Sequence, residues 1–157
     1  MTQTPAKHSS NDKVYCLGII FDKDLDTVML IKRSRGPHYG KWNAIGGHQE
    51  PGESPWVAIA RECLEETEII TTPSEWLLIG HVNGNGWVMD VLSTVLYSRA
   101  VPKLEHIKND EFDEIKRVKI ADITKLECAD YLTALIHLAL ERHKNKLTSI
   151  ISSIQIA

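Results

Sequence analysis

A glycine-rich turn followed by a helix with three glutamates on one side constrains this chain more than any other feature. Segment 47–53 (GHQEPGE) is followed, after seven residues, by segment 61–66 (RECLEE). The three glutamates have the spacing i, i+3 and i+4, which places their side chains on one face of a helix. Like charges arranged in this way repel each other and destabilise an isolated helix. We therefore expect a cation to lie between Glu62, Glu65 and Glu66.

The type of ligand indicates which cation this is. Carboxylate oxygens favour a hard divalent ion, Mg²⁺ with Mn²⁺ as its substitute, over zinc. A solvated acidic helix face is the ordinary interpretation of Glu-x-x-Glu-Glu alone, but here the glycine-rich turn comes directly before it. Ser54 suits the N-cap and Pro55 suits the first helical position, so the sequence also marks where the helix begins.

The whole run resembles the Nudix box, Gly-x5-Glu-x7-Arg-Glu-hydrophobic-x-Glu-Glu-x-Gly-hydrophobic. Ile69 closes the motif, and six fixed positions are in register: Gly47, Glu53, Arg61, Glu62, Glu65 and Glu66. Two positions depart from the pattern. Cys63 replaces a bulky aliphatic residue and is expected to pack as a small hydrophobe. Glu68 stands where the family has glycine, which would serve a left-handed helix cap, so we expect a changed helix exit.

The resemblance implies a site and a reaction. Nudix proteins typically hydrolyse the pyrophosphate link of a nucleoside diphosphate joined to another group. By resemblance, the carbonyl of Gly47 and three glutamates bind the metal ions, and Glu62 doubles as general base. The predicted catalytic set is completed by Glu53 and Arg61, which pair with each other, and by Glu65. A further metal-binding carboxylate often comes from outside the box. Glu114 is the candidate, and Glu111 is its alternative. For either residue, a charge exposed to solvent in a loop is the simpler explanation.

The segment before the box bears on the substrate. Residues 40–47 (GKWNAIGG) resemble the Gly-x-Trp-Asn-x-x-Gly-Gly of MutT-like enzymes that hydrolyse oxidised purine nucleotides such as 8-oxo-dGTP. In that group an asparagine at this position contacts the base, which makes Asn43 the predicted specificity residue. An amide donates and accepts at once, so it can form two hydrogen bonds with a base edge. The alternative is a structural hydrogen bond in a turn. Trp42 is expected in the core.

Three more side chains are predicted to bind the substrate. Arg33 falls, counting back without gaps, where the same group carries a basic residue near the phosphates. Asp90 interrupts an apolar strand, and a buried acid can hydrogen-bond a purine. Asp130 begins the last helix, where the helix dipole is the simpler explanation for an acid. A separate prediction concerns histidines that lack metal-ligand spacing and are expected at the surface or in loops: His38, His48 and His81.

Length and composition predict one domain of ordinary soluble type. The chain has 157 residues, which we divide into a mobile polar tail at 1–12, a Nudix domain at 13–145, and a tail at 146–157. The last tail is an added strand, a homodimer contact or disordered. No apolar stretch is long enough for a membrane span, and three widely spaced cysteines suggest a reducing cytoplasmic setting. The net charge of −3 argues against electrostatic binding of polymeric nucleic acid.

Apolar periodicity predicts alternating strands and helices. Residues 14–21 are apolar on both faces, as in a buried central strand. Helices are predicted from residue 55 and over 130–144, and the other strands over 27–33, 76–82, 87–97 and 114–120. With the resemblance, this order predicts an α/β fold, namely the α/β/α sandwich of the Nudix fold with a mixed central sheet.

Three functional hypotheses follow from the resemblance. The first is a Mg²⁺-dependent pyrophosphohydrolase that converts a purine nucleoside triphosphate, or oxidised dGTP, to the monophosphate and pyrophosphate. The second keeps the mechanism and changes the substrate to ADP-ribose, a dinucleoside polyphosphate or capped RNA. The third is a non-catalytic Nudix regulator that only binds nucleotides. Such proteins usually lose a box glutamate, whereas here all of them are present.

Overall fold

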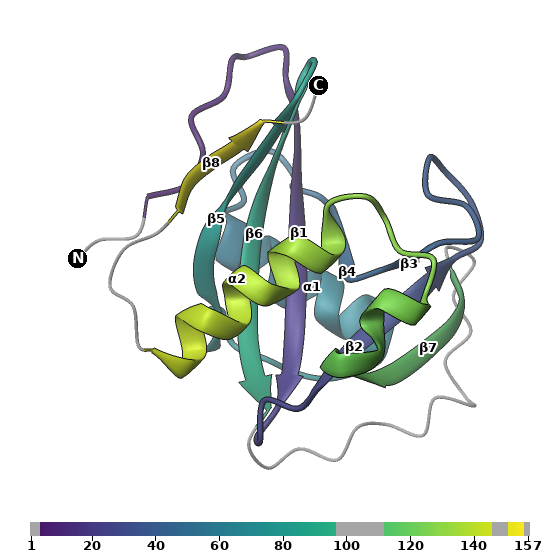
Figure 1. Cartoon of the computed structure of the whole chain (residues 1–157). Helices are drawn as coiled ribbons and strands as arrows, with labels where there is room; N and C mark the ends of the chain where they lie inside the picture. The colour runs from purple at the N-terminus through teal and green to yellow at the C-terminus, as the bar shows by residue number, and fades with distance from the viewer. Residues whose placement is uncertain (1–3, 97–111, 146–150, 156–157) are drawn as a thin grey trace.

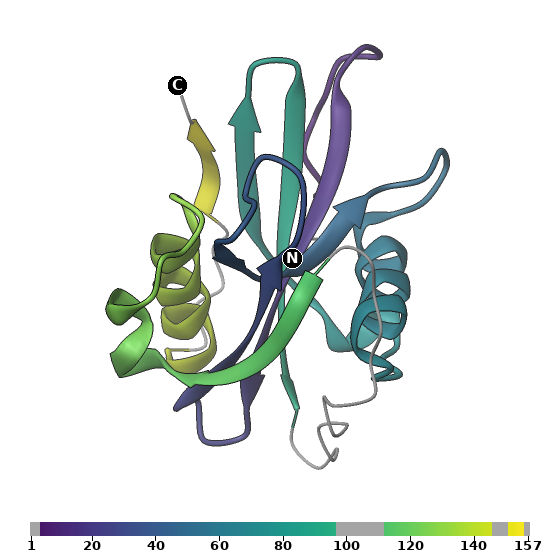
Figure 2. The same ribbon diagram turned by 90° about the vertical axis from the view of Figure 1, so that its right-hand side faces the viewer.

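A mixed β-sheet lies between two helices in the computed structural model, which describes residues 4–96, 112–145 and 151–155. Figure 2 shows the layers: α1 (Pro55–Thr67) covers one face of the sheet and α2 (Leu132–Lys144) covers the other. The predicted α/β/α sandwich with a mixed central sheet is therefore confirmed. Glu111 and the predicted strand end at Tyr97 lie outside the described residues.

The sheet has eight strands in the order β3-β2-β1-β6-β5-β8, with β4 paired to β1 and β7 paired to β2 (Figure 1). Two 3-10 turns, η1 and η3, span Pro73–Glu75 and Ile120–Lys125. The bounds of the strands are β1 Lys13–Asp22, β2 Thr27–Arg33, β3 Trp42–Asn43, β4 Ile45–His48, β5 Leu77–Gly84, β6 Trp87–Leu96, β7 Phe112–Lys119 and β8 Ile151–Gln155.

Strand β1 lies at the centre because it pairs with three neighbours. It runs parallel to β6 and antiparallel to β2 and β4. Its side chains alternate between two cores: Leu17, Ile19 and Phe21 pack on the side of α2, whereas Cys16 and Ile20 pack on the side of α1. This double burial confirms the predicted central strand, because a strand covered on both faces needs apolar residues at odd and even positions.

The chain changes its partner strand at Ala44, and this step positions the site. β3 pairs with β2 through Trp42 and Asn43, whereas β4 pairs with β1 from Ile45 onward. The stretch from Trp42 to His48 therefore forms two short strands rather than one. Asn43 and Gly46 are only three residues apart in extended chain, which corresponds to about 10 Å.

The two predicted tails each include a segment that contacts the sheet. The backbone N–H of Ala6 donates to Asp90 Oδ1 at 2.9 Å, and β8 pairs in parallel with β5. The division at residues 13 and 145 stays a prediction. Among the described residues, no helix is both long and apolar enough to cross a bilayer.

Helix α1 begins and ends with defined caps. The Ser54 hydroxyl accepts a hydrogen bond from the Val57 N–H, and Pro55 occupies the first turn, as predicted. Cys63 is completely buried, which confirms its expected role as a small hydrophobe. At the other end, Glu68 has φ 59° and ψ 11°, and its N–H donates to the Leu64 carbonyl. The expected change of the helix exit is therefore wrong: the exit is left-handed even though the residue there is glutamate.

We expect Glu68→Gly to raise the free energy of unfolding by about 0.5–1 kcal/mol. A left-handed residue with a Cβ is strained, and glycine removes the strain while adding some entropy to the unfolded chain. Urea denaturation at neutral pH would measure the change. Glu68→Ala is the matched control, because it removes the same charge but keeps the Cβ. Equal stabilisation by both substitutions would show that the removed charge, and not the backbone conformation, causes the effect.

Candidate active site

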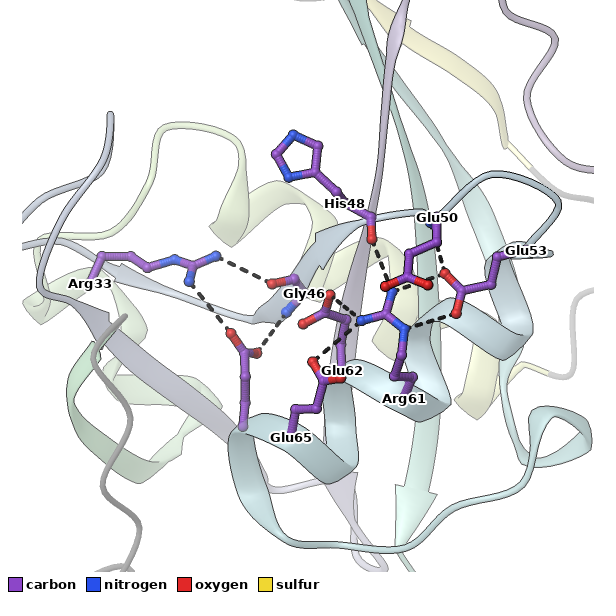
Figure 3. A network of polar contacts seen from close by, with 9 residues as sticks. Arg33, Gly46, His48, Glu50, Glu53, Arg61, Glu62 and Glu65 are labelled. Carbon is purple, nitrogen blue, oxygen red and sulfur yellow. Dashed lines mark hydrogen bonds and ion pairs between the residues drawn. The ribbon is translucent and has the colours of Figure 1, made fainter.

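The three glutamates of α1 lie side by side but differ in exposure. Glu62 and Glu66 are buried, with 7% and 1% of their surface exposed, whereas the side chain of Glu65 is 54% exposed. Figure 3 shows Glu62 and Glu65 near β4, the strand that carries Gly46 and His48. The predicted common helix face is therefore present, and it points at the β4 end of the sheet.

Arg61 uses all three of its guanidinium nitrogens to contact Glu53 and two of these glutamates, Glu62 and Glu65 (Figure 3). Nε and Nη2 donate to the two carboxylate oxygens of Glu53 at 2.8 and 2.9 Å, a bidentate pair. Nη1 donates to Glu62 at 2.8 Å and to Glu65 at 3.3 Å, and Nη2 also donates to the His48 carbonyl at 3.0 Å. Arg61 thus compensates the repulsion between two of the glutamates.

The ion pair of Glu53 and Arg61 stabilises the charged form of both groups. The hydrogen bonds from Arg61 lower the pKa of Glu53, and the hydrogen bond with Glu53 raises the pKa of Arg61. Glu53 also accepts a hydrogen bond from the backbone N–H of Glu50 at 2.9 Å, which closes the turn before the helix. The predicted pairing of these two residues is present in the structure, and it orients the guanidinium toward the helix face.

Two glycines allow β4 to approach its neighbours closely: Gly47 approaches α1, and Gly46 approaches β1. A Cβ on Gly47 would collide with the carboxylate of Glu62, so the absence of a side chain there makes room for that group. A Cβ on Gly46 would collide with the carbonyl oxygen of Cys16, and Gly46 has φ 151°. Gly46 also donates its N–H to Glu66 Oε2 at 2.9 Å.

Arg33 reaches the same place from the end of β2. Its Nη1 lies 3.5 Å from Glu66 Oε1, and its Nη2 donates to the Gly46 carbonyl at 3.5 Å (Figure 3). The structure therefore brings the predicted phosphate-binding arginine next to a predicted metal ligand. The side chain of Arg33 is 19% exposed.

The glutamate oxygens of the site suit a hard divalent cation, but they form ion pairs with arginines and do not converge on one point. Glu62, Glu65 and Glu66 offer carboxylate oxygens, which is the set that Mg²⁺ prefers. Within residues 4–96 and 114–145, no three His, Cys, Asp or Glu side chains converge closely enough to hold a metal ion as they stand. Arg61 and Arg33 instead pair with the glutamates.

The structure does not bring Glu114 to the three glutamates. Glu114 is exposed and lies opposite Lys32 in the β2–β7 ladder. Its neighbour Ile115 packs in the core on the side of α1, and side chains alternate along a strand, so Glu114 faces the other side of the sheet.

A second polar cluster surrounds Asn43. Its Oδ1 accepts a hydrogen bond from the Ala44 N–H at 2.9 Å, and its Nδ2 lies 3.4 Å from the Tyr131 hydroxyl. That hydroxyl is also 3.1 Å from His38 Nε2, and the two rings meet edge to face. Trp42, by contrast, lies in the core, as predicted. We name Asn43, Tyr131 and His38 the amide cluster.

Arg33 links the amide cluster electrostatically to the glutamates. Burial lowers the pKa of His38, and the charges of Arg33 and Lys41 lower it further. Burial raises the pKa of Tyr131 against the opposing effect of Asn43 and Arg33. The predicted Asp130 lies at the rim, where its exposed carboxylate is 3.5 Å from Lys41 Nζ.

Asp90 lies in a different environment from Asn43. Its carboxylate is buried and accepts three hydrogen bonds, from Ala6 N–H at 2.9 Å, His81 Nδ1 at 2.8 Å and Gln49 Nε2 at 2.8 Å. Burial alone would raise the pKa of Asp90, but these hydrogen bonds outweigh it and lower the pKa. The prediction that His81 is a surface or loop residue is wrong: it lies in β5 with a side chain only 12% exposed.

We expect Asp90→Asn to lower the free energy of unfolding by about 2–3 kcal/mol at neutral pH. All three partners are donors, and an amide turns one acceptor into a fourth donor. Because the folded-state pKa is lowered, the wild-type advantage is complete above about pH 4 and declines as the pH falls through the folded-state pKa. Denaturation of both proteins between neutral and acid pH would measure this, with the exposed Asp24→Asn as control. A difference independent of pH would contradict the assignment.

Sequence reasoning missed Tyr131 and His38 as possible site residues. Tyr131 follows the predicted Asp130 directly, and His38 lies in the loop between two predicted strands, so both were close to residues already chosen. No local pattern connects them, because His38 and Tyr131 are 93 positions apart in sequence.

Comparison with known proteins gives one consistent family. Residues 12–136 match the family model of the NUDIX domain. The NUDIX domain of Shewanella oneidensis NrtR, solved with ADP ribose, has a TM-score of 0.71 at 21% identity, over 84% of this chain and 88% of that one. The MutT protein of Bacillus halodurans has a TM-score of 0.69 at 20% identity, over 92% and 90%.

A third structure is a bifunctional NMN adenylyltransferase/ADP ribose pyrophosphatase from Francisella tularensis, solved with AMP and a manganese ion. It has a TM-score of 0.68 at 19% identity, over 83% of this chain and 42% of that one. These likenesses concern the fold, whereas the family match covers most of the sequence together with the glutamate-bearing helix. The chain belongs to the Nudix family.

Proposed function

We propose that this Nudix pyrophosphohydrolase cleaves purine nucleoside triphosphates, in the presence of Mg²⁺, to the monophosphate and pyrophosphate. The observation that carries the proposal is the place of Arg33 between the two polar clusters. Its guanidinium contacts Glu66, and its charge acts on His38 and Tyr131 in the amide cluster. A nucleotide with its phosphates at the glutamates and its base toward Asn43, a residue that is 2% exposed, would pass Arg33.

The glutamates are the ligands that we propose for the cation. Nudix hydrolases generally use divalent metals, and Glu62, Glu65, Glu66 and the Gly47 carbonyl provide oxygen donors of the appropriate type. A bound Mg²⁺ supplies an acidified water and neutralises the phosphate charge. For Glu62 and Glu65 to face a cation, Arg61 must weaken its Nη1 contacts with them, and it can do so while it keeps the bidentate pair with Glu53.

Glu62 is the residue that we propose as general base. It is buried beside Gly47, and it has one hydrogen bond from Arg61 that holds its carboxylate toward β4. It would accept the proton of a water that attacks one phosphorus of the α–β link. The bond that breaks joins that phosphorus to the bridging oxygen, and Arg33 is placed to stabilise the negative charge of the phosphates.

A specific observation favours a second candidate substrate. One structure with this fold, the NrtR domain, holds ADP ribose. ADP-ribose, dinucleoside polyphosphates and capped RNA contain the same pyrophosphate link, so they would use the same glutamates. A non-catalytic nucleotide-binding role is less well supported, because every box glutamate is present and Arg61 joins Glu53, Glu62 and Glu65 in one network.

We expect Asn43→Ala to raise KM for purine nucleoside triphosphates about tenfold and to leave kcat nearly unchanged. Loss of a hydrogen bond with the base weakens binding by about 0.5–1.5 kcal/mol, and the phosphates still bind at the glutamates. Steady-state kinetics with dGTP and dTTP would measure the effect. An equal rise for both nucleotides would contradict base recognition and favour a structural role for Asn43.

A product-resolved hydrolysis screen tests the proposal as a whole. It should cover the four dNTPs, 8-oxo-dGTP, ADP-ribose and a diadenosine polyphosphate, with Mg²⁺ and then with Mn²⁺. Release of monophosphate and pyrophosphate from a purine triphosphate would support the proposal. Turnover of ADP-ribose or the dinucleotide alone would keep the metal site and overturn the assigned substrate class.

A further inference from the structure

The amide cluster contains a directional chain of hydrogen bonds. Asn43 Oδ1 accepts from the Ala44 N–H, which fixes the amide so that Nδ2 faces Tyr131. Nδ2 can only donate, so the Tyr131 oxygen accepts. When the His38 ring is neutral and carries its proton on Nδ1, the Tyr131 hydroxyl can donate to His38 Nε2, 3.1 Å away.

This chain leaves Asn43 with a defined set of free positions. One N–H of the amide and one lone pair of Oδ1 are not used by Ala44 or Tyr131. Those two positions form the donor–acceptor pair that can read a base edge. If Tyr131 were to release Nδ2, the amide would be held only by Ala44, and the direction of its free N–H would no longer be fixed.

We propose that Tyr131 and His38 are positioning residues for base recognition: they hold the Asn43 amide, and protonation of His38 loosens this hold. The inference rests on the proposed role of Asn43. A protonated imidazole must donate from Nε2 to the Tyr131 oxygen. The Tyr131 proton then loses its acceptor, and His38 competes with Asn43 Nδ2 for the lone pairs of that oxygen. Neither residue touches the reacting phosphates in this assignment, and their effect passes through Asn43.

The charges around His38 agree with a neutral ring at neutral pH. Arg33 and Lys41 face it from the end of β2 and from the loop before β3, and Asp130 faces it from the loop before α2. Two positive charges and partial burial oppose protonation, whereas Asp130 favours it and is itself exposed beside Lys41. The pKa of His38 therefore lies below its ordinary value.

The test compares selectivity between two nucleotides rather than absolute rates. The ratio of kcat/KM for dGTP to that for dTTP cancels the titration of the phosphates and of the glutamates, and neither base changes charge between about pH 5.5 and about pH 8. We expect this ratio to fall in wild type as the pH falls below the ordinary His pKa. In Tyr131→Phe the ratio at neutral pH should fall about 3- to 10-fold, through KM rather than kcat.

His38→Gln is the decisive variant, because an amide oxygen can accept from Tyr131 but does not titrate. We expect it to keep the wild-type ratio at neutral pH and to lose the pH dependence, whereas His38→Ala should lower the ratio at every pH. A ratio unchanged in Tyr131→Phe, or a wild-type pH profile in His38→Gln, would overturn the proposal. If Asn43→Ala also leaves the ratio unchanged, both the base recognition in the proposed function and the positioning role of Tyr131 and His38 are wrong. If Asn43→Ala lowers the ratio but the Tyr131 and His38 variants do not, only the positioning role is wrong.

Discussion

We expect Glu62→Gln to lower kcat by roughly 10²–10⁴-fold while the protein stays folded. The substitution keeps the shape of the side chain and removes its ability to accept a proton. Glu62 is buried between α1 and Gly47, where no other described carboxylate can take its place: Glu66 is turned to Arg33 and Gly46, and Glu65 is half exposed. Single-turnover kinetics at saturating Mg²⁺ would measure the effect on the chemical step.

Glu68→Gln is the matched control for this experiment. It makes the same chemical change one and a half turns further along, at an exposed position outside the Arg61 network, and kcat should stay within about twofold of wild type. Circular dichroism of both variants would verify the fold. A Glu62→Gln enzyme with more than a tenth of the wild-type kcat would exclude Glu62 as the base and direct attention to Glu65 or Glu66.

Gly46→Ala is expected to lower the free energy of unfolding by about 3 kcal/mol or more. The new Cβ would collide with the Cys16 carbonyl oxygen in the neighbouring strand, and a backbone atom cannot rotate away as a side chain can. Relief of the collision would require β4 to separate from β1, which would also displace the Gly46 N–H that donates to Glu66. Urea denaturation would give the loss of stability, and kcat should fall with it.

Two other glycines provide controls for Gly46→Ala. Gly52 also has a positive φ, 80°, but an added Cβ would meet nothing within 4 Å, so Gly52→Ala measures backbone strain alone, about 1 kcal/mol. Gly47→Ala places the new Cβ against the flexible carboxylate of Glu62, and we expect it to impair turnover more than stability. A loss of stability for Gly46→Ala no larger than that for Gly52→Ala would contradict the steric argument.

The arrangement of Arg61 changes how the acidic helix face is understood. The sequence led us to expect a cation between three repelling glutamates, and in the structure a guanidinium from the same helix provides part of that positive charge. The Nη1 group that contacts Glu62 and Glu65 would have to compete with a divalent ion for them. Arg61 is therefore both a support for the cluster and a reason why the metal ligands are not gathered in advance.

Local patterns predicted the elements that position the site. The start of α1 at Ser54 and Pro55 followed from cap preferences, and the common face of the glutamates followed from helical periodicity. The expected change of the helix exit at Glu68 was wrong, because the glutamate itself adopts the left-handed cap conformation. These features depend on residues within a few positions of each other, so one stretch of sequence contains the information.

The type of a residue predicted its role less well when its contacts come from distant parts of the chain. Asp90 was chosen as a lone acid in an apolar strand, but its partners His81, Gln49 and Ala6 lie 9, 41 and 84 positions away. Glu114 was chosen because it opens a strand, yet the β2–β7 register directs it to the face opposite α1. In both cases the residue was correctly placed in a strand, and the three-dimensional pairing decided what it faces.

The sequence by itself determined the family, the acidic face of α1 and the ion pair between Glu53 and Arg61. All three belong to one motif, whose residues have a fixed spacing along a short segment. Only the tertiary structure decided that Arg33 lies between Glu66 and the amide cluster, and that Tyr131 and His38 contact each other near Asn43. The physical reason is that sheet register and the path of the chain between strands bring distant residues together. Side-chain periodicity predicts which face a residue occupies, but not which residue it will meet there.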